Sequence, residues 1–432
     1  MNVDNKETNH LFLKVFSYNS IVVVGKLITS FVVSKVSAIY LGPSGYAIVG
    51  NFKNVLQGLL GITSTGFQSG VVKYVTENKN DKEKLNILIS SVLFLTVIIS
   101  FVVGILIYLF SEQLTVYVLK EPTYIYVFEW LAFFLPLVSL NFITIYIANG
   151  LQKIRLYTLI ITLSNVVNAL GSFFLIYYFN LKGALMASLI VPSLSFLLGF
   201  IFKEIREIYS VFYKYYKDIS ITFIKSISTY LFMAIYSSIL ISLSYILIRN
   251  KIIESINTFN AGLWEAMNKI STFYMMFFSS LFTLYLLPEL TNNKTVKGYY
   301  QIMKHYFKYI LPIMLVLFTG LYIFRVYVIK IVLTNEFEYV KHFFLLQFVG
   351  DFIKILAFSI AYQFHAKKMV KFYLISDFIL YGTFYIFSTF LINDFNLQGI
   401  YYAYILSALL YFLSVVLFVS RNNQKYLVTH VL

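Results

Sequence analysis

The sequence predicts an all-α polytopic membrane protein of about twelve transmembrane helices, arranged as two parallel six-helix lobes around a central cavity. Three observations predict this fold class. The 432 residues are 59% hydrophobic and only 12% charged, with a mean hydropathy of +0.78, whereas soluble domains carry about 25% charged residues. Apolar runs of spanning length recur along the whole chain, and one short motif recurs half a chain later.

Apolar runs of about 20 residues, the length that crosses about 30 Å of hydrocarbon, predict the individual helices. They fall at 16–41, 45–72, 85–110, 124–149, 155–179, 183–202, 221–248, 256–288, 302–324, 343–365, 371–392 and 398–420. The eighth run is long enough to contain a break or a strong tilt. The polar start and the long apolar run after it predict that the first span is retained rather than cleaved as a signal peptide.

The lysines and arginines outside these spans predict the orientation of the chain. Counted over alternate loops, 21 lie on one side and 7 on the other. Because cytoplasmic loops carry the excess of basic residues, we expect both termini in the cytoplasm. The same distribution accounts for the net charge of +15, so the charge does not indicate a nucleic-acid partner.

An internal repeat predicts the two lobes. Phe179-Asn180-Leu181-Lys182-Gly183 recurs as Phe395-Asn396-Leu397-Gln398-Gly399, an offset of 216 residues. Six spans per half bring both halves into the membrane from the same side, so the repeats are parallel. Such a duplication favours a binding site between the halves and transport by alternating access. The predicted domains are an N-terminal lobe at 1–202, a cytoplasmic linker at 203–218 and a C-terminal lobe at 219–432.

Six lysines lie inside the predicted spans, where each costs about 2.5–3.5 kcal/mol on insertion scales. They are Lys26, Lys35, Lys53, Lys225, Lys269 and Lys354. Lys26 and Lys53 lie too deep to reach water easily, and we expect them to face a cavity that binds an anionic headgroup. Lys35 either joins them or extends to the outer interface, and Lys225 is expected to extend to the cytoplasmic interface.

Carboxylates in the spans leave two interpretations open. Glu265 precedes Lys269 by four residues and Asp351 precedes Lys354 by three, spacings that favour ion pairs within a helix. Each pair either neutralises a buried charge or holds a lysine for an anionic ligand. Asp351 and Asp377 are also candidates for coupling to an ion or a proton.

Several classes of protein are excluded by what the sequence lacks. It contains no cysteine, no nucleotide-binding loop and no nucleophile-elbow motif, and its five histidines lack the spacing of a metal site. We therefore predict no catalytic residues, no metal and no cofactor, and we do not expect an enzyme. A membrane-embedded glycan polymerase usually carries a large external loop, and the longest external connection here, 325–342, is short.

Two stretches resemble a known family. The first runs from Leu41-Gly42-Pro43-Ser44-Gly45-Tyr46 through Asn51-Phe52-Lys53-Asn54 to Gly66-Phe67-Gln68-Ser69-Gly70-Val71-Val72-Lys73-Tyr74. The second runs from Ala261-Gly262-Leu263-Trp264-Glu265-Ala266-Met267-Asn268-Lys269-Ile270-Ser271 to Tyr285-Leu286-Leu287-Pro288-Glu289-Leu290. Both resemble the Wzx-type flippases, which comprise O-antigen and lipid III flippases. The resemblance implies the fold of the multidrug/oligosaccharidyl-lipid/polysaccharide exporter superfamily.

The resemblance also implies a function. Its substrate would be undecaprenyl pyrophosphate carrying an oligosaccharide repeat unit, as in O-antigen and lipopolysaccharide biosynthesis, moved from the cytoplasmic to the periplasmic leaflet of a bacterial inner membrane. The matching cavity lysines are Lys26, Lys53 and Lys269. A polymerase and a chain-length regulator of the same glycan pathway are candidate partners. The alternative is a cation-coupled multidrug exporter of the same fold, which a carboxylate-dominated cavity would favour.

Overall fold

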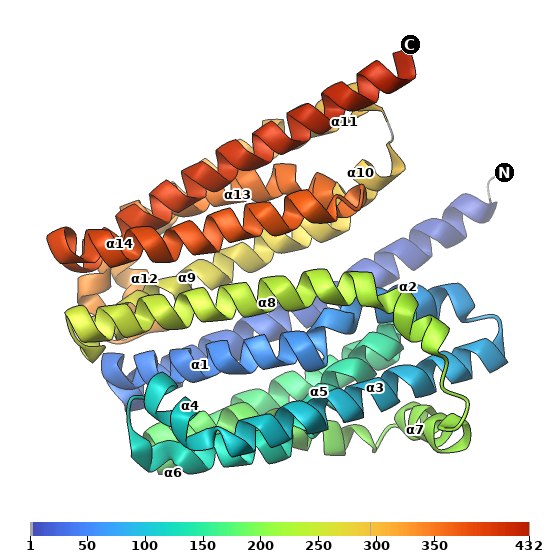
Figure 1. The fold of residues 1–432 in the computed structure, drawn as a ribbon, viewed down its shortest axis with the longest axis horizontal. Coiled ribbons are helices and arrows are strands. Elements are labelled where there is room, and N and C mark those ends of the chain that lie inside the picture. The colour runs from blue at the N-terminus through green and yellow to red at the C-terminus, as the bar shows by residue number, and fades with distance from the viewer. Residues whose placement is uncertain (1–2, 294, 432) are drawn as a thin grey trace. The chain divides into compact units, whose positions relative to one another are not determined.

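The computed structural model describes residues 3–293 and 295–431, with the side chains of 21–225, 231–283, 285–293 and 295–422. Every regular element in these ranges is a helix (Figure 1). Eight helices are long and apolar enough to cross a membrane, which confirms an all-helical, multi-pass membrane protein. The spanning ranges are Ile21–Thr63, Lys82–Leu109, Pro122–Gly150, Ile154–Gly199, Leu231–Ser255, Val296–Ile323, Phe344–Ala366 and Val370–Asn422.

Three of the long helices contain a kink. α1 (Val3–Thr63), α6 (Ile154–Gly199) and α14 (Val370–Val431) are interrupted at Gly42, Asn180 and Asn396, with φ angles of 59°, 50° and 49°. Glycine and asparagine tolerate these positive φ values better than other residues. The predicted spans 155–179 and 183–202 therefore lie on one kinked helix, as do 371–392 and 398–420.

The chain divides into two compact units. Unit 1 comprises Met1–Leu41 and Asn51–Ile239, and unit 2 comprises Gly42–Gly50 and Leu240–Leu432. α8 (Ile221–Ser255) contributes to both units, as does α1. The segment after the Gly42 kink therefore belongs to unit 2, and α7 and the first half of α8 belong to unit 1.

Unit 1 is a bundle in which α5 packs against α3 and α6. The predicted linker forms α7, whose buried Ile205 packs with Ala148 of α5 and with Leu156 and Ile160 of α6. Besides parts of α1 and α8, the helices of unit 1 are η1 (Thr65–Phe67), α2 (Gln68–Asn78), α3 (Lys82–Leu109), α4 (Ser111–Val118), η2 (Pro122–Tyr124), α5 (Ile125–Gly150), α6 and α7 (Lys203–Tyr215).

Unit 2 is built around the pair formed by α13 and α14. A π-helix at Phe282–Leu286 interrupts the long apolar run 256–288, at which the sequence predicts a break or a tilt. Besides parts of α1 and α8, the helices of unit 2 are α9 (Thr258–Leu281), the π-helix η3, α10 (Leu287–Asn292), α11 (Val296–Ile323), α12 (Arg325–Val332), the 3₁₀-helix η4 (Asn335–His342), α13 (Phe344–Ala366) and α14.

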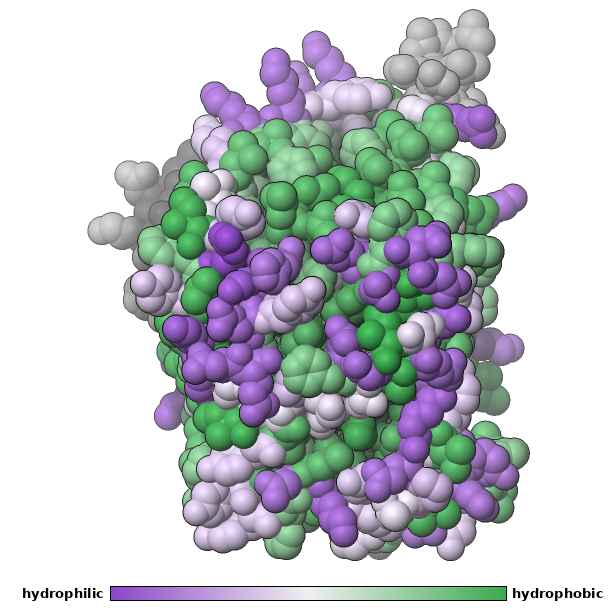
Figure 2. All heavy atoms as spheres, turned by 90° about the vertical axis from the view of Figure 1, so that its left-hand side faces the viewer, coloured by the Kyte–Doolittle hydropathy of each residue, from purple (hydrophilic) through white to green (hydrophobic). Residues whose placement is uncertain are grey.

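The surface reflects the two environments of a membrane protein. Large apolar side chains such as Phe133, Val316 and Phe390 lie exposed along the long helices, where lipid tails replace water. Hydrophilic residues gather on the end of the structure at which α4 lies, among apolar ones (Figure 2). This is the pattern expected of a face that meets water beyond the hydrocarbon.

The sequence repeat is reproduced in backbone geometry. Asn180 and Asn396, which are 216 residues apart, share φ and ψ of 50°, −127° and 49°, −136°. At the same offset, Gln152 and Lys368 have φ values of 57° and 54° in the turns before α6 and α14. α3 with α4 also matches α11 with α12 in helix lengths, 28 and 8 residues in each case. The two halves therefore use one set of local structures twice.

Each repeated kink is closed by a glycine. A Cβ atom added to Gly183 would collide with the carbonyl oxygen of Leu175, and one added to Gly399 would collide with that of Leu391. In both halves, the helix after the kink lies directly against the turn before it. The repeated motif thus ends in glycine because no side chain fits there.

We predict that Gly183→Ala and Gly399→Ala each lower the free energy of unfolding by about 1–3 kcal/mol, the usual cost of overpacking. Thermal unfolding of the purified protein in detergent measures this. Gly320→Ala is the matched control, because an added Cβ meets nothing within 4 Å on α11. Equal unfolding temperatures for all three variants would show that the close approach is absent.

Candidate functional site

A polar cavity of about 290 Å³ lies within unit 1 and includes Lys26. It is formed by α1, α2, α5 and both segments of α6. Its lining is Lys26, Gln68, Asn141, Phe142, Ile145, Tyr146, Asn149, Tyr157, Ile161, Ser164, Asn165, Asn168, Val191, Pro192 and Ser195. We call this the Lys26 cavity. Its side chains come from helices that the sequence places in the hydrocarbon, so it is a polar pocket at membrane depth.

Close packing brings Asn165 of α6 against α1, the helix that carries Lys26. A Cβ on Gly25 would lie 3.0 Å from Nδ2 of Asn165, so the glycine lets this amide approach the helix that carries Lys26. Thr29 donates a hydrogen bond from Oγ1 to the carbonyl oxygen of Asn165, at 3.2 Å. One turn further along α6, Asn168 Oδ1 accepts from Ser172 Oγ at 2.9 Å, which fixes the orientation of that amide.

Two polar groups of the lining lack a partner. Among the described residues, Nδ2 of Asn165 and Oγ of Ser164 are buried and make no hydrogen bond. A buried polar group without a partner costs about 1–3 kcal/mol, so such groups usually have a reason to be there. An acceptor-rich ligand in the cavity would recover this cost at both positions.

The polar groups of the lining are cationic or neutral. The lining holds one ammonium, five carboxamides and several hydroxyls, and none of the described lining residues is a carboxylate. An ammonium attracts an anion, and Lys26 is exposed, so its charge is accessible to a ligand that enters the cavity. The carboxamides and hydroxyls can donate to and accept from a neighbouring hydroxylated group. The cavity is therefore suited to an anion attached to a polar, oxygen-rich body.

The other predicted cavity lysines lie elsewhere. Lys35 is half-buried and Lys53 is exposed; both are on the unit 1 parts of α1, and neither lines the Lys26 cavity. Lys269 is on α9 of unit 2, half-buried, with its Nζ 5.6 Å from the ring centre of Phe273. Beside it in the chain, Nδ2 of Asn268 is buried without a hydrogen-bond partner.

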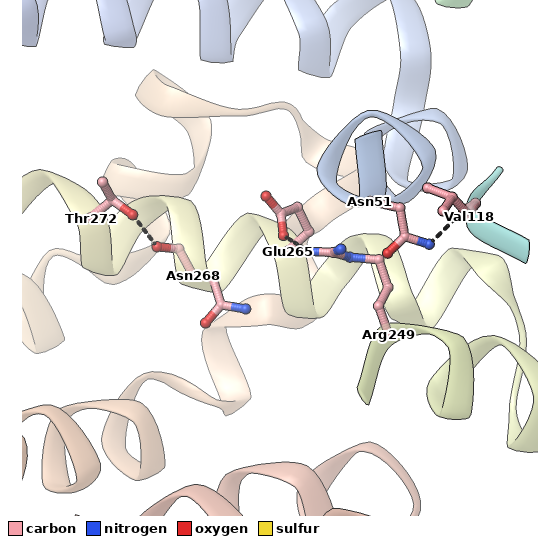
Figure 3. Close-up of polar contacts among 6 residues, drawn as sticks. All are labelled: Asn51, Val118, Arg249, Glu265, Asn268 and Thr272. Atoms are coloured by element: carbon pink, nitrogen blue, oxygen red, sulfur yellow. Dashed lines mark hydrogen bonds and ion pairs between the residues drawn. The ribbon is translucent and has the colours of Figure 1, made fainter. Parts of the chain in front are cut away.

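Glu265 forms its ion pair with a residue that the sequence had placed outside the membrane. Its carboxylate accepts from the guanidinium of Arg249 on α8 (Figure 3). Arg249 is completely buried and its guanidinium carbon lies 5.3 Å from the ring centre of Trp264. Gly50 makes room, because a Cβ there would lie 2.7 Å from the carboxyl carbon of Glu265. Sequence reasoning missed Arg249 because the predicted span ended one residue earlier.

Asp351 lies at the centre of a second buried cluster, in unit 2. It is 1% exposed and accepts four hydrogen bonds. Oδ2 accepts from Ser271 at 2.8 Å, from Gln347 at 3.0 Å and from the hydroxyl of Tyr274, and Oδ1 accepts from the hydroxyl of Tyr404 at 2.6 Å. These four hydrogen bonds offset part of the cost of burying the carboxyl group.

Lys354 and Asp377 complete this cluster. The Nζ atom of Lys354 lies 5.5, 5.9 and 5.4 Å from the ring centres of Phe358, Tyr381 and Tyr404. The charges of Asp351 and Asp377 both act on this ammonium. The structure therefore brings together three residues that the sequence proposed for charge pairing or coupling, and it surrounds the lysine with aromatic faces that stabilise a cation.

A family model for polysaccharide biosynthesis proteins matches residues 12–294. The chain belongs to the polysaccharide biosynthesis protein family. A relative, the lipid III flippase of Escherichia coli (strain K12), is 21% identical over 388 residues, which cover 90% of this chain and 93% of that protein.

Solved structures extend the comparison for this family member. It is similar to an inward-facing multidrug resistance MATE family transporter of the MOP superfamily, with a TM-score of 0.76, 16% identity, and coverage of 91% of this chain and 95% of that one. It is also similar to a MOP superfamily transporter from Pyrococcus furiosus for which a reversed polarity of the binding pocket suggests a different function, with a TM-score of 0.64, 15% identity, and coverage of 92% and 95%. The fold is that of the MOP superfamily.

Residues 42–50 of the first stretch meet the second stretch in unit 2. A Cβ on Gly262 of α9 would collide with the carbonyl of Pro43, and Gly42 has the positive φ described above. The ring of Tyr46 lies 5.5 Å from that of Phe337 on η4. These motif residues therefore hold the segment 42–50 in place in this family member.

For the buried ion pair we predict that Glu265→Gln destabilises the protein by about 3–5 kcal/mol, because Arg249 keeps its charge and loses its partner. The double variant Arg249→Met/Glu265→Gln should lose much less than the sum of the single losses. The free energies of unfolding in detergent of the wild type, both single variants and the double variant form a double-mutant cycle that measures this coupling. The exposed Glu289→Gln variant is the control. A Glu265→Gln variant as stable as the control would show that the pair contributes nothing.

Proposed function

We propose that the protein is a flippase that moves undecaprenyl-pyrophosphate-linked oligosaccharide repeat units from the cytoplasmic to the periplasmic leaflet of a bacterial inner membrane. The observation that carries this proposal is the Lys26 cavity, a cationic, carboxamide-rich pocket at membrane depth. The family membership and the likeness to a lipid III flippase support it. The finer statements of topology belong to the same proposal: twelve crossings in two six-helix lobes, with both termini cytoplasmic.

The lining of the cavity suits a sugar attached to a phosphate. Lysine is a compact point charge that binds a phosphate oxygen without requiring a fixed bidentate geometry. Asn165 Nδ2 and Ser164 Oγ have hydrogen-bonding capacity to spare for sugar hydroxyls. At about 290 Å³ the cavity is at the lower end of the usual ligand-pocket range of about 300–1,000 Å³. It therefore accepts one headgroup unit, while the polyprenyl chain stays in the lipid and the remaining sugars stay outside the pocket.

Alternating access supplies the mechanism that we propose. The anionic headgroup binds from the cytoplasmic side, and rocking of one lobe against the other opens the site to the periplasm. Lys53 and Lys269 are proposed as further contacts for the pyrophosphate, and Lys35 as a flanking positive charge. The cargo can shift the protein from one conformation to the other only by as much as its binding free energies to the two conformations differ. The lysines therefore contribute to the conformational change only if their surroundings differ between the two conformations.

The alternative, a cation-coupled multidrug exporter, fits the cavity less well. A cationic cargo calls for carboxylates, and none of the described residues lining the Lys26 cavity is one. The acids of unit 2 do not supply an open cation site at Asp351, because its two oxygens already accept four hydrogen bonds. We propose that Lys354 is the resident cation of that cluster and that its role is charge pairing.

We predict that Lys26→Gln lowers transport about tenfold to a hundredfold, because a hydrogen bond to a charged group contributes about 1.5–3 kcal/mol. Asn165→Leu should weaken transport less, since it removes one neutral donor. Surface glycan in a flippase-deficient strain measures both, and lipid-linked single repeat units should accumulate on the cytoplasmic side. Lys225→Gln, at an exposed position on α8, is the charge-matched control.

Two results would contradict the proposal. One is full surface glycan with Lys26→Gln, Lys53→Ala and Lys269→Ala variants that assemble in the membrane at normal levels. The other is loss of drug resistance, with no change in lipid-linked intermediates, when the gene is removed. The second result would favour the exporter.

A further inference from the structure

A second cavity lies where the beginning of α6 meets α7, at the end of unit 1 that the charge distribution assigns to the cytoplasm. It has a volume of about 560 Å³. Its lining is Lys153, Ile154, Arg155, Leu156, Leu159, Phe202 and Glu204. Two cations, one carboxylate and four apolar side chains thus surround one hollow, and their charges sum to one positive charge.

The two cations of this cavity are not engaged elsewhere. Within the part of the chain that the structure describes, the side chains of Lys153 and Arg155 form neither a hydrogen bond nor an ion pair, and both are exposed. Neighbouring basic residues are engaged. Arg206 donates to the carbonyl oxygens of Phe200 and Ile201 at the end of α6, and Lys79 donates to Gln152 at 2.8 Å. Lys153 and Arg155 are therefore free to bind an external anion.

A lipid-facing stripe begins at the same place. Exposed residues follow Arg155 along the first segment of α6 at intervals of three or four, which is one face of a helix. They are Leu159, Thr162, Val166, Leu170, Phe173 and Tyr177. Leu159 is 42% exposed and also lines the cavity, so the hollow and the stripe are continuous. An acyl chain lying on this face would have its headgroup beside Arg155.

We propose that this cavity binds a phospholipid of the cytoplasmic leaflet that carries a single negative charge and a hydroxylated headgroup, of the phosphatidylglycerol type. The phosphate lies between Lys153 and Arg155, the acyl chain follows Leu159 along α6, and Ile154 and Phe202 cover the glycerol region. Basic pockets between membrane helices on the cytoplasmic side bind anionic lipid headgroups. This site is separate from the Lys26 cavity, and it does not depend on the cargo.

Glu204 decides between lipid headgroups. Its carboxylate can accept hydrogen bonds from the hydroxyls of a glycerol headgroup, while it repels a second negative charge such as that of a phosphomonoester. A zwitterionic lipid leaves the net positive charge of the cavity uncompensated. A lipid with one net negative charge and free hydroxyls satisfies all three charged side chains together.

The test uses the full chain in phosphatidylcholine nanodiscs that contain a photoactivatable phosphatidylglycerol, with labelled peptides of α6 and α7 identified by mass spectrometry. We expect labelling of these peptides, and displacement by unlabelled phosphatidylglycerol but not by phosphatidylethanolamine or by glycerol phosphate. Each cation removed should weaken labelling about fivefold, the factor for one basic residue near an anionic surface. The variants are Lys153→Gln, Arg155→Gln and both together.

Lys297→Gln/Lys304→Gln is the matched control, because it removes two exposed cations from the start of α11. It should label α6 and α7 as the wild-type protein does. A loss of labelling in this control equal to that in the Lys153→Gln/Arg155→Gln variant would show that the charge of the whole surface, and not the cavity, attracts the lipid. Unchanged labelling in the Lys153→Gln/Arg155→Gln variant, or equal displacement by phosphatidylethanolamine, would overturn the proposal. Displacement by glycerol phosphate would replace the lipid with a soluble phosphate.

Discussion

The absence of water in the bilayer core is the constraint on which this structure depends. Every charge or backbone polar group at that depth must find its partner within the protein, because each one left without a partner costs several kcal/mol. Helices satisfy the backbone, and buried clusters satisfy the charges. Arg249 is completely buried because Glu265 neutralises it and Trp264 covers its guanidinium. Asp351 is buried because four hydrogen bonds reach its two oxygens.

The same constraint explains why the fold class was predictable from the sequence. Apolar length alone identifies a spanning helix, and no soluble core competes for the same pattern. The repeat was equally visible, since Asn180 and Asn396 stand in one motif and adopt one backbone conformation. The unit boundaries were not visible. The chain passes into unit 2 at Gly42, between two predicted spans, and returns to unit 1 at Asn51, within the second of them. Periodicity carries no signal for which neighbour a turn of helix packs against.

The site residues were predictable in proportion to their charge. Lysines in apolar runs stand out, and Lys26 does line a polar cavity. Glu265 illustrates the limit, because spacing along α9 favoured Lys269 while the fold brings Arg249 from α8 to the carboxylate. Asn165 and Asn168 were overlooked because carboxamides carry no charge, and only charged residues were singled out within the spans. Their spacing of three residues on one helix face, close to Ser164, was the signal that the sequence offered.

The polar clusters of the two units differ in how completely their hydrogen-bonding groups are paired. In unit 2 the oxygens of Asp351 are fully used and Lys354 stands among aromatic rings, so the cluster has little reason to bind or release a ligand. In unit 1 the Lys26 cavity keeps a hydroxyl and a carboxamide without partners, and a folded protein retains such groups at a cost in stability. Such a cost in the empty protein is tolerated where a bound ligand removes it. Under the function proposed above, a cargo that occupies the cavity removes this cost, so the unsatisfied groups favour binding over the empty state. Complete satisfaction of the lining in the empty state would have given a more stable unit with no reason to take up a ligand.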